Sequence, residues 1–414
     1  MLLALNRRKT GTAGELVAKL DISHFLFLFF WVMKPLYFGP SGTMQISDFI
    51  FVLSFIAWIF CHKGNISIDK KDLPLLAFVF ATLIINGIYA ALYGEISFVL
   101  STAYYVYNLA VVVVMRDFIR NKLFLKALLW ASAFNLMMEL AVLFLGMGRY
   151  TWEMYRFMGT FNDPNQFSFS MFTSFLIVYL LSSYFKDLEK SRRKAVVLIV
   201  FALAFFFIFR GSSTGMLLGI ATFSLLFAFT FISSERTPLF MFLKVLAIIM
   251  LAAVVVYVLL AGFSSGNING SVESDSFLIV RLFEKADKVE GGGLMALIDE
   301  RGIDKLFTNP LYLLFGAGEG GLWRFPGSEF EIHSTLLGIL FYYGILPFIL
   351  LMSWFKNNLK NVSRMAIPVF LALLFESFTL ANQRQPALWV ILVLGSLEYA
   401  NAQELRKYRI VVRL

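Results

Sequence analysis

Residues 262–333 read GFSSGNINGSVESDSFLIVRLFEKADKVEGGGLMALIDERGIDKLFTNPLYLLFGAGEGGLWRFPGSEFEIH, and they form the single long polar stretch of the chain. Hydrophobic runs stand on both sides of this stretch, and the other connections between such runs are short. Irregular backbone cannot face lipid without losing its hydrogen bonds, so an insertion of this length is expected outside the apolar layer. Function should depend on this loop and on the few polar residues that face it.

The composition supports the same class of protein. The chain has 414 residues, of which 59% are hydrophobic and 15% are charged, whereas a soluble domain carries about 25% charged residues. The sequence therefore predicts an all-α polytopic membrane protein, with residues 1–414 forming one integral membrane domain. The single cysteine, Cys61, excludes a disulfide framework within one chain, and three histidines give no pattern for a zinc cluster.

Twelve apolar runs are long enough to cross a hydrocarbon layer of about 30 Å, some of them only when tilted. The predicted spans are 22–38, 45–61, 73–93, 96–115, 123–147, 166–185, 195–210, 214–233, 239–262, 332–355, 365–381 and 385–401. Between spans nine and ten lies the long loop, 263–331. Residues 277–290 and 294–307 within it have the apolar periodicity of amphipathic helices, which we expect to cover the mouth of the protein.

The distribution of Lys and Arg predicts the orientation. Most of the 36 basic residues fall on alternate connections, such as Arg7 to Lys9 and Lys186 to Lys194. By the positive-inside rule both termini are then cytoplasmic and the long loop lies outside. The net charge of +9 is explained by this topology, so no nucleic-acid partner is expected.

Two short outer segments carry unusual polar residues. Asn162-Asp163-Pro164-Asn165 is a strong turn signal, and a helix should begin at Gln166. This motif alone is explained by a well-made turn, but Arg156 just before it gains nothing topologically on the outer side.

The second segment is FRGSSTGMLLG, in which Arg210 precedes Ser212 and Ser213 at the start of a helix. Such a helix start beside an arginine can bind an anion. Equally, the serines can cap the helix while Arg210 extends to the membrane surface.

His333 stands where the long loop re-enters the apolar layer, near Arg281, Arg324 and Glu331. An imidazole with a pKa of about 6.5 can accept a proton from a hydroxyl at neutral pH. A lone histidine at such a position can also be an ordinary interfacial residue. The glycines at 316, 318, 320 and 321 resemble a nucleotide-binding loop, but no strand precedes them and we reject that interpretation.

Charged residues inside apolar runs need partners. Glu376 is predicted to pair with Arg384, on the next short turn, or with Arg210. Glu139 is a second such carboxylate. Asn86, Asn108 and Asn135 can join helices by hydrogen bonds.

Taken together, five arginines are predicted on the outer side, together with one potential base. Several guanidiniums in one place favour a diphosphate or another polyanion, and a base beside them favours an acceptor hydroxyl. The predicted ligand-binding residues are Arg156, Arg210, Arg281, Arg324 and Arg384, with Glu376, Asn162, Asn165, Ser212 and Ser213 in supporting positions.

Three segments of this chain are similar to signatures of the O-antigen polymerase/O-antigen ligase superfamily of bacterial membrane glycosyltransferases. RFMGTFNDPNQFS (156–168) resembles that family's R-x-x-G-T-F-x-x-P-N segment. FRGSSTGMLLGI (209–220) resembles its S-R-G or S-R-x-x-x-L element, with a Phe before the Arg here. NPLYLLFGAGEGG (309–321) followed by EIHSTLLGILFYYGILPFILL (331–351) resembles the family's loop end.

The resemblance implies a GT-C-like helical enzyme of the bacterial inner membrane, with its active site facing the periplasm. Its donor would be an undecaprenyl-diphosphate-linked oligosaccharide, and neither metal nor other cofactor would be needed. Arg210 and Arg281 would hold the diphosphate, and His333 would deprotonate the acceptor hydroxyl. A chain-length regulator and a flippase are the partners that such an enzyme implies, besides membrane lipids.

Three functions stay open. The first is a polysaccharide polymerase that transfers the growing glycan onto a lipid-linked repeat unit. The second is a ligase that transfers the glycan to lipid A-core or protein. The third is a secondary transporter of an anionic substrate, which would need polar residues at mid-membrane depth and broken helices.

Overall fold

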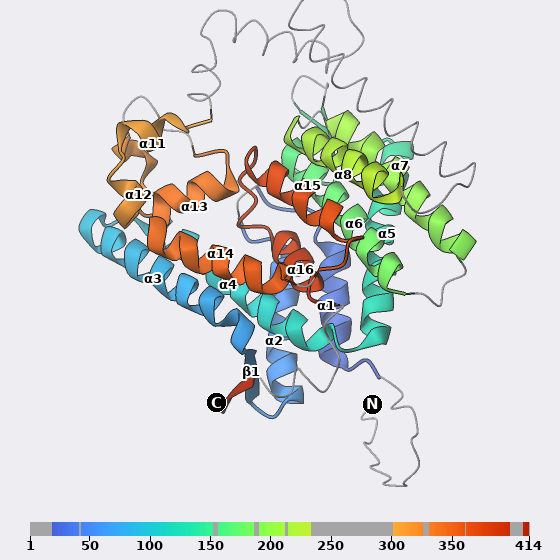
Figure 1. Cartoon of the computed structure of the whole chain (residues 1–414), viewed down its shortest axis with the longest axis horizontal. Coiled ribbons are helices and arrows are strands. Elements are labelled where there is room, and N and C mark those ends of the chain that lie inside the picture. The colour runs from blue at the N-terminus through green and yellow to red at the C-terminus, as the bar shows by residue number, and fades with distance from the viewer. Residues whose placement is uncertain are drawn as a thin grey trace, which may run out of the picture.

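The computed structural model describes residues 19–40, 43–151, 156–185, 190–211, 214–232, 301–325, 331–360, 362–397 and 409–413 (Figure 1). Most of these residues are helical. Five helical segments are long and apolar enough to cross a membrane: 70–93, 96–118, 122–144, 164–184 and 193–211. The prediction of an all-α membrane protein is therefore confirmed. The number of spans stays a prediction, because the span at 239–262 lies outside the described residues.

The first five helices follow the predicted apolar runs. α1 (Ile22–Met33) and α2 (Ile46–Cys61) pack against each other, and α3 (Leu73–Tyr93) packs along α4 (Ile96–Phe118). Gly94, with a φ of +69°, ends α3 and permits the short turn into α4. α5 (Lys122–Phe144) is capped by Asn121, whose side chain accepts hydrogen bonds from the backbone N–H groups of the first turn.

The predicted Asx-Pro turn starts a buried helix. Asp163 caps α6 (Pro164–Tyr184) by accepting hydrogen bonds from the N–H groups of Asn165 and Gln166, both at 2.8 Å. This helix is surrounded by others: α5, α7 (Lys190–Gly211) and α16 (Pro386–Leu394) all contact it, and α8 (Thr214–Ile232) does so less extensively. α6 thus carries the motif at 162–165 on the start of a helix in the middle of the bundle.

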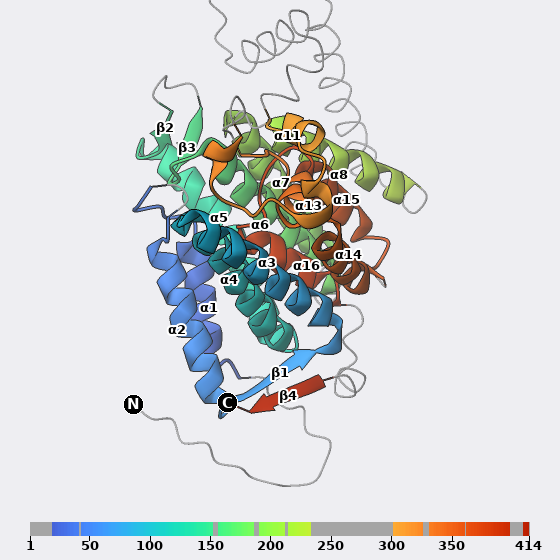
Figure 2. The ribbon, with the colours of Figure 1, turned by 90° about the vertical axis from the view of Figure 1, so that its left-hand side faces the viewer.

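Two small sheets mark the two ends of the bundle (Figure 2). β1 (Asn65–Asp69) pairs antiparallel with β4 (Arg409–Arg413) at one end, which we call the β1–β4 end. β2 (Arg149–Tyr150) pairs with β3 (Phe157–Gly159) at the opposite end, where α11 (Asp304–Thr308) also lies. We call this second end the loop end, because the described part of the long polar loop lies there.

The last apolar runs are interrupted. The predicted continuous span at 332–355 is wrong: Gly344, with φ +77° and ψ 177°, separates α13 (Thr335–Tyr343) from α14 (Ile345–Leu359). α12 (Tyr312–Phe315) and the residues after it fill the break. The N–H of Ala317 donates to Phe341 O at 3.0 Å and that of Gly318 to Tyr342 O at 2.8 Å. The loop backbone thereby satisfies carbonyls at the end of α13.

Two further predictions need correction or lie beyond the described residues. The helix predicted at 294–307 is wrong at residues 301–303, which form a turn, whereas residues 304–307 are helical in α11 and residues 294–300 lie outside the described residues. Gly302 has a φ of +64°, a conformation that ends a helix. The helix predicted at 277–290 lies outside the described residues. α15 (Ile367–Ser377) and α16 are short and are joined by the non-helical segment 378–385.

Candidate functional site

Polar segments that are far apart in the sequence meet at the loop end. Arg156 Nε donates to Gly211 O, at the end of α7, at 2.9 Å. A Cβ added to Gly215, at the start of α8, would lie 2.5 Å from Thr379 Oγ1. Thr335, which begins α13, binds the carbonyl of Leu380 through its N–H at 2.9 Å. The segments 156–165, 210–211, 214–215, 331–335 and 379–385 are thus joined by direct contacts, and we call this region the loop-end site.

A buried carboxylate that the sequence analysis did not single out organises one half of this site. Glu319 has a side-chain exposure of 2%. It accepts hydrogen bonds from Tyr105 Oη at 3.0 Å and Tyr343 Oη at 2.8 Å. Arg384 Nη2 lies 2.8 Å from the same carboxylate. These donors come from α4, the end of α13 and the segment 378–385, so Glu319 links three elements. We call Tyr105, Glu319, Glu331, Tyr343, Gln383 and Arg384 the Glu319 cluster.

The glycines around Glu319 allow the loop backbone to reach the helices. A Cβ on Gly316 would lie 2.7 Å from Tyr342 O, and one on Gly318 would lie 2.6 Å from the ring of Tyr89. Both glycines also have positive φ values. The N–H of Glu319 donates to Asn86 Oδ1 at 2.9 Å. The glycine-rich segment therefore serves close packing against α3 and α13.

Arg324 holds the same loop together. Its Nη2 donates to the carbonyls of Ala317, at 2.7 Å, and Gly320, at 3.0 Å. Its guanidinium also lies 4.8 Å from the ring centre of Tyr89 and 5.0 Å from that of Phe98. The predicted role of Arg324 in binding a diphosphate stays a prediction, but these contacts already give its guanidinium a structural use.

Arg384 is shared between two carboxylates. Its Nη2 lies 2.8 Å from Glu319 Oε1 and 3.0 Å from Glu331 Oε1. Burial favours a lower pKa for Arg384, but the negative charges of Glu319 and Glu331 outweigh it and raise the pKa above its ordinary value. The guanidinium, 29% exposed, is therefore a permanent cation at the loop-end site.

The other half of the site contains the residues around the Asx-Pro turn. Arg156 Nη2 donates to Asn165 Oδ1 at 3.1 Å. Asn162 accepts a hydrogen bond from Arg149 and donates to the carbonyl of Gly39. Arg210 is exposed, and its one hydrogen bond within the described residues is long, 3.5 Å from Nη2 to Tyr150 Oη. Of the predicted anion-binding arginines that are described, Arg210 is the least engaged. Arg281, Ser212 and Ser213 lie outside the described residues.

His333 is exposed and is fixed through its backbone. It stands two residues before α13, where Ser334 caps the helix by accepting from Leu337 N at 3.3 Å. The N–H of His333 donates to Arg301 O at 2.9 Å, and Arg301 Nη1 in turn donates to Thr379 O at 3.2 Å. Arg301, which the sequence analysis did not single out, therefore connects the histidine to the segment 378–385 and leaves its imidazole accessible.

The predicted partner of Glu376 is wrong. Glu376 is fully buried near the end of α15, and Asn382 Nδ2 donates to its Oε1. In the part of the chain that the structure describes, its Oε2 has no hydrogen-bond partner. The N–H groups of Thr379 and Leu380 bind the carbonyl of Glu376, so the chain turns back at once. This turn brings Asn382 to the carboxylate and carries Arg384 on to Glu319.

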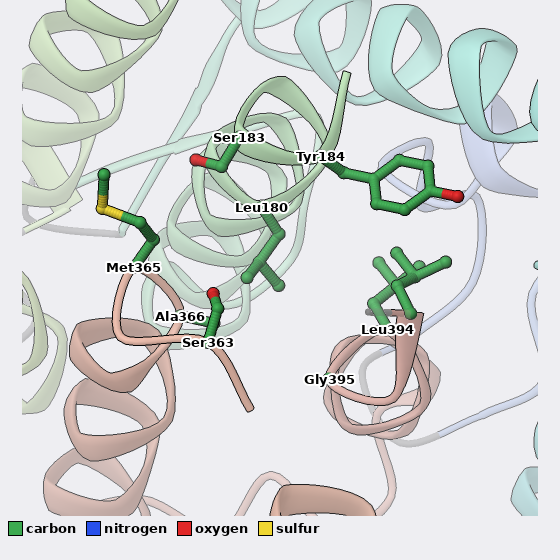
Figure 3. A pocket seen from close by; sticks show the side chains of 9 residues that line it. Leu180, Ser183, Tyr184, Ser363, Met365, Ala366, Leu394 and Gly395 are labelled. Atoms are coloured by element: carbon green, nitrogen blue, oxygen red, sulfur yellow. The ribbon is translucent and has the colours of Figure 1, made fainter. Parts of the chain in front are cut away.

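A pocket lies away from these residues. It is lined by residues from the end of α6, from the segment just before α15 and from the end of α16, including Leu180, Tyr184, Met365 and Leu394 (Figure 3). Its position is at the opposite end of α6 from Asn165, so it is not part of the loop-end site. Within the described ranges, no group of three His, Cys, Asp or Glu side chains could hold a metal ion.

The fold and this site define a polytopic α-helical membrane protein with a polar site at one end of its bundle. No family model, no curated protein and no solved structure matches the chain. The likeness to O-antigen polymerases and ligases therefore depends on the three sequence segments quoted above.

Proposed function

We propose that this protein is a polysaccharide polymerase of the bacterial inner membrane. It would transfer a growing glycan from undecaprenyl diphosphate onto a lipid-linked repeat unit at the periplasmic face, within a GT-C-like fold. The observation that carries the proposal is the loop-end site, because segments 156–165, 210–211, 214–215 and 331–335 belong to the three family-like motifs and meet there beside segment 379–385.

The chemistry assigned to these residues is base-assisted transfer. The imidazole of His333 would accept the proton of the acceptor hydroxyl, whose oxygen then attacks the anomeric carbon of the donor sugar. The bond from that carbon to the diphosphate oxygen breaks, and the lipid diphosphate leaves with the electron pair. Arg210 and Arg384 would offset the charge that develops on the leaving group, so this step is proposed without a metal. A flippase and a chain-length regulator would be its partners.

Removal of His333 is the direct test of this mechanism. His333→Ala should lower polymer formation by about 10²- to 10⁴-fold, the usual contribution of a general base, while expression and thermal stability stay unchanged because the side chain is exposed. The matched control is His62→Gln, which removes a histidine at the opposite end of the bundle and should leave polymer formation intact. Normal chain-length ladders from His333→Ala would contradict the base assignment.

The acceptor separates polymerase from ligase. Purified protein supplied with lipid-linked repeat units alone should elongate them if it is a polymerase. Product that forms only after lipid A-core or an acceptor protein is added would identify a ligase.

A transporter is the second candidate, and the interrupted helices favour it. α13 and α14 are separated at Gly344, α15 and α16 are separated by 378–385, and Glu376 is buried next to the second interruption. Proteoliposomes that accumulate an anionic glycan or sugar phosphate, with the same rate for wild type and His333→Ala, would support this candidate over the enzyme.

A further inference from the structure

We propose that the carboxylate of Glu331 competes with a diphosphate for the guanidinium of Arg384, so that Glu331 sets the affinity of the loop-end site for its anionic ligand. The identity of the ligand rests on the proposed function. The competition itself is a property of the residues around Arg384 and can be measured without any transfer reaction.

The two carboxylates on Arg384 are unequal. Glu319 is 2% exposed, whereas Glu331 is 42% exposed. Glu319 also receives hydrogen bonds from Tyr105 and Tyr343, and its backbone N–H is bound by Asn86. Among the described residues Glu331 has one ion pair, at 3.0 Å with Arg384, and Lys305 interacts with it electrostatically. Exposed ion pairs of this kind contribute little, so Glu331 can leave Arg384 while Glu319 stays.

The charge of the cluster leads to the same conclusion. Arg384 supplies one positive charge and is bound by the negative charges of Glu319 and Glu331, while Lys305 is a second cation that interacts electrostatically with Glu331. A diphosphate that approaches Arg384 therefore meets two carboxylates already paired with the guanidinium, unless Glu331 withdraws or is neutralised. A guanidinium can donate to a phosphate in the same forked geometry that it uses for a carboxylate. The phosphate therefore replaces Glu331, because this carboxylate is bound to Arg384 more weakly than Glu319 is.

The exchange would be coupled to His333. Only Ile332 separates Glu331 from His333, whose N–H is bound by the carbonyl of Arg301 at 2.9 Å. Departure of Glu331 from Arg384 removes one of the contacts that fix residues 331–333 in the described structure, and leaves the hydrogen bonds from Ile332 N to Tyr342 Oη at 3.3 Å and from His333 N to Arg301 O. Binding of a ligand to Arg384 should therefore change the surroundings of the His333 imidazole. In this way, occupation of Arg384 and the position of the proposed base are linked.

The test is a binding measurement on the full-length protein purified in detergent. Dissociation constants for inorganic pyrophosphate and for a short prenyl diphosphate are measured for wild type and three variants. Glu331→Gln should bind both ligands about three- to fivefold more tightly, the range that loss of one exposed ion pair allows. Arg384→Ala should lose most of the affinity. Glu95→Gln, which removes another carboxylate at the loop end, hydrogen-bonded to Trp323 at 3.0 Å, should match wild type.

The outcomes separate this inference from the proposed function. Equal or weaker binding by Glu331→Gln overturns the competition, and so does the absence of pyrophosphate binding in both wild type and Glu331→Gln. Tighter binding by Glu331→Gln together with normal polymer from His333→Ala supports the competition and contradicts the polymerase mechanism. Nanodiscs containing phosphatidylglycerol serve as the third ligand: a Glu331→Gln effect seen only there assigns the site to phospholipid headgroups and overturns its assignment to diphosphate.

Discussion

Two arginines are held by buried carboxylates at opposite ends of the bundle, and their surroundings differ. Near the β1–β4 end, Arg116 pairs with Asp72 at 2.9 Å, and the two side chains are 6% and 1% exposed. At the loop end, Arg384 pairs with Glu319 at 2.8 Å, and the two are 29% and 2% exposed. The first pair is sealed by protein, whereas the second opens toward the surface and carries the additional carboxylate of Glu331.

The hydrogen bonds of the Asp72 pair are complete within the protein. Arg116 donates to Asn358 and, at 2.6 Å, to Ser396 Oγ, while Trp354 Nε1 donates to Asp72 at 2.7 Å. One positive and one negative charge balance each other there. We conclude that the Asp72 pair fixes α4 and α14 relative to each other, and that only the Glu319 cluster has the means to exchange a ligand.

The comparison predicts a large difference in stability between two matched substitutions. Arg116→Ala leaves Asp72 buried without its cation, so it should lower the free energy of unfolding by about 3–5 kcal/mol. Arg384→Ala should cost about 1–3 kcal/mol, because Glu319 keeps its tyrosine donors and the arginine is partly exposed. Thermal unfolding of the two variants in the same detergent measures both.

The double variant Asp72→Leu with Arg116→Met is the control, since replacing both charges by apolar side chains should recover most of the loss. An Arg384→Ala variant that is less stable than Arg116→Ala would show that the loop-end pair is the main structural one, and the comparison would then be reversed.

A second prediction concerns the interruption on which the Glu319 cluster depends. Gly344 has φ +77° and ψ 177°, a region open essentially to glycine alone, and a Cβ there would lie 2.5 Å from Leu314 O. Gly344→Ala should therefore lower the free energy of unfolding by about 1–3 kcal/mol because of the backbone conformation. The clash with Leu314 should lower it further. The substitution should also displace the loop that carries Glu319. Melting temperature and protease accessibility of residues 309–325 measure the two effects.

Gly94→Ala is the matched control for Gly344→Ala. Gly94 also has a positive φ, +69°, but a Cβ there would meet nothing within 4 Å. Gly94→Ala should therefore lower the free energy of unfolding by only about 1–2 kcal/mol, which is the cost of the backbone conformation. Equal losses for the two variants would mean that the packing of the loop against α13 adds nothing to the cost of the interruption.

These two regions also show what the sequence could predict. Hydropathy located the helices, and the turn chemistry at 162–165 located the start of α6, because both signals are local. The Glu319 cluster was not predicted, since Glu319 binds Asn86 and Tyr105, which are more than 200 positions away. The interruption at Gly344 was missed for a similar reason. One glycine in an apolar run costs a helix only about 1 kcal/mol, and the break depends on the loop that fills it.

The loop-end arginines illustrate a further limit of sequence reasoning. Their residue type and their predicted side of the membrane indicated a shared anion site. The structure joins Arg156 to the end of α7, leaves Arg210 with a long contact to Tyr150 of β2, and uses Arg324 to bind four loop carbonyls. A guanidinium that binds a phosphate and one that binds a carbonyl have the same sequence signature, because both use the same donors.

The smallest expected effect on stability concerns a third ion pair, between His62 and Asp117, which is partly exposed and lies near the Asp72 pair. Asp117 follows Arg116 on α4, and its carboxylate lies 3.0 Å from Nε2 of His62, whose side chain is 35% exposed. Nδ1 of the same imidazole lies 2.9 Å from the carbonyl oxygen of Trp58. Both ring nitrogens therefore face acceptors, which favours the doubly protonated cation. The hydrogen bond to Asp117 raises the pKa of His62 above its ordinary value, although burial acts in the opposite direction.

The sign of the pH dependence follows from this shift. A folded-state pKa above the unfolded value of about 6.5 means that His62 stabilises the protein fully below that value. The contribution is lost as the pH rises through the raised pKa. Wild type should therefore melt about one or two degrees above His62→Gln near pH 6, and this difference should shrink near pH 9. In an Asp117→Asn background the difference should be small at both pH values. If Asp117 is present and the difference in melting temperature between wild type and His62→Gln does not change with pH, then this pair, like the Asp72 pair, acts through packing rather than through charge.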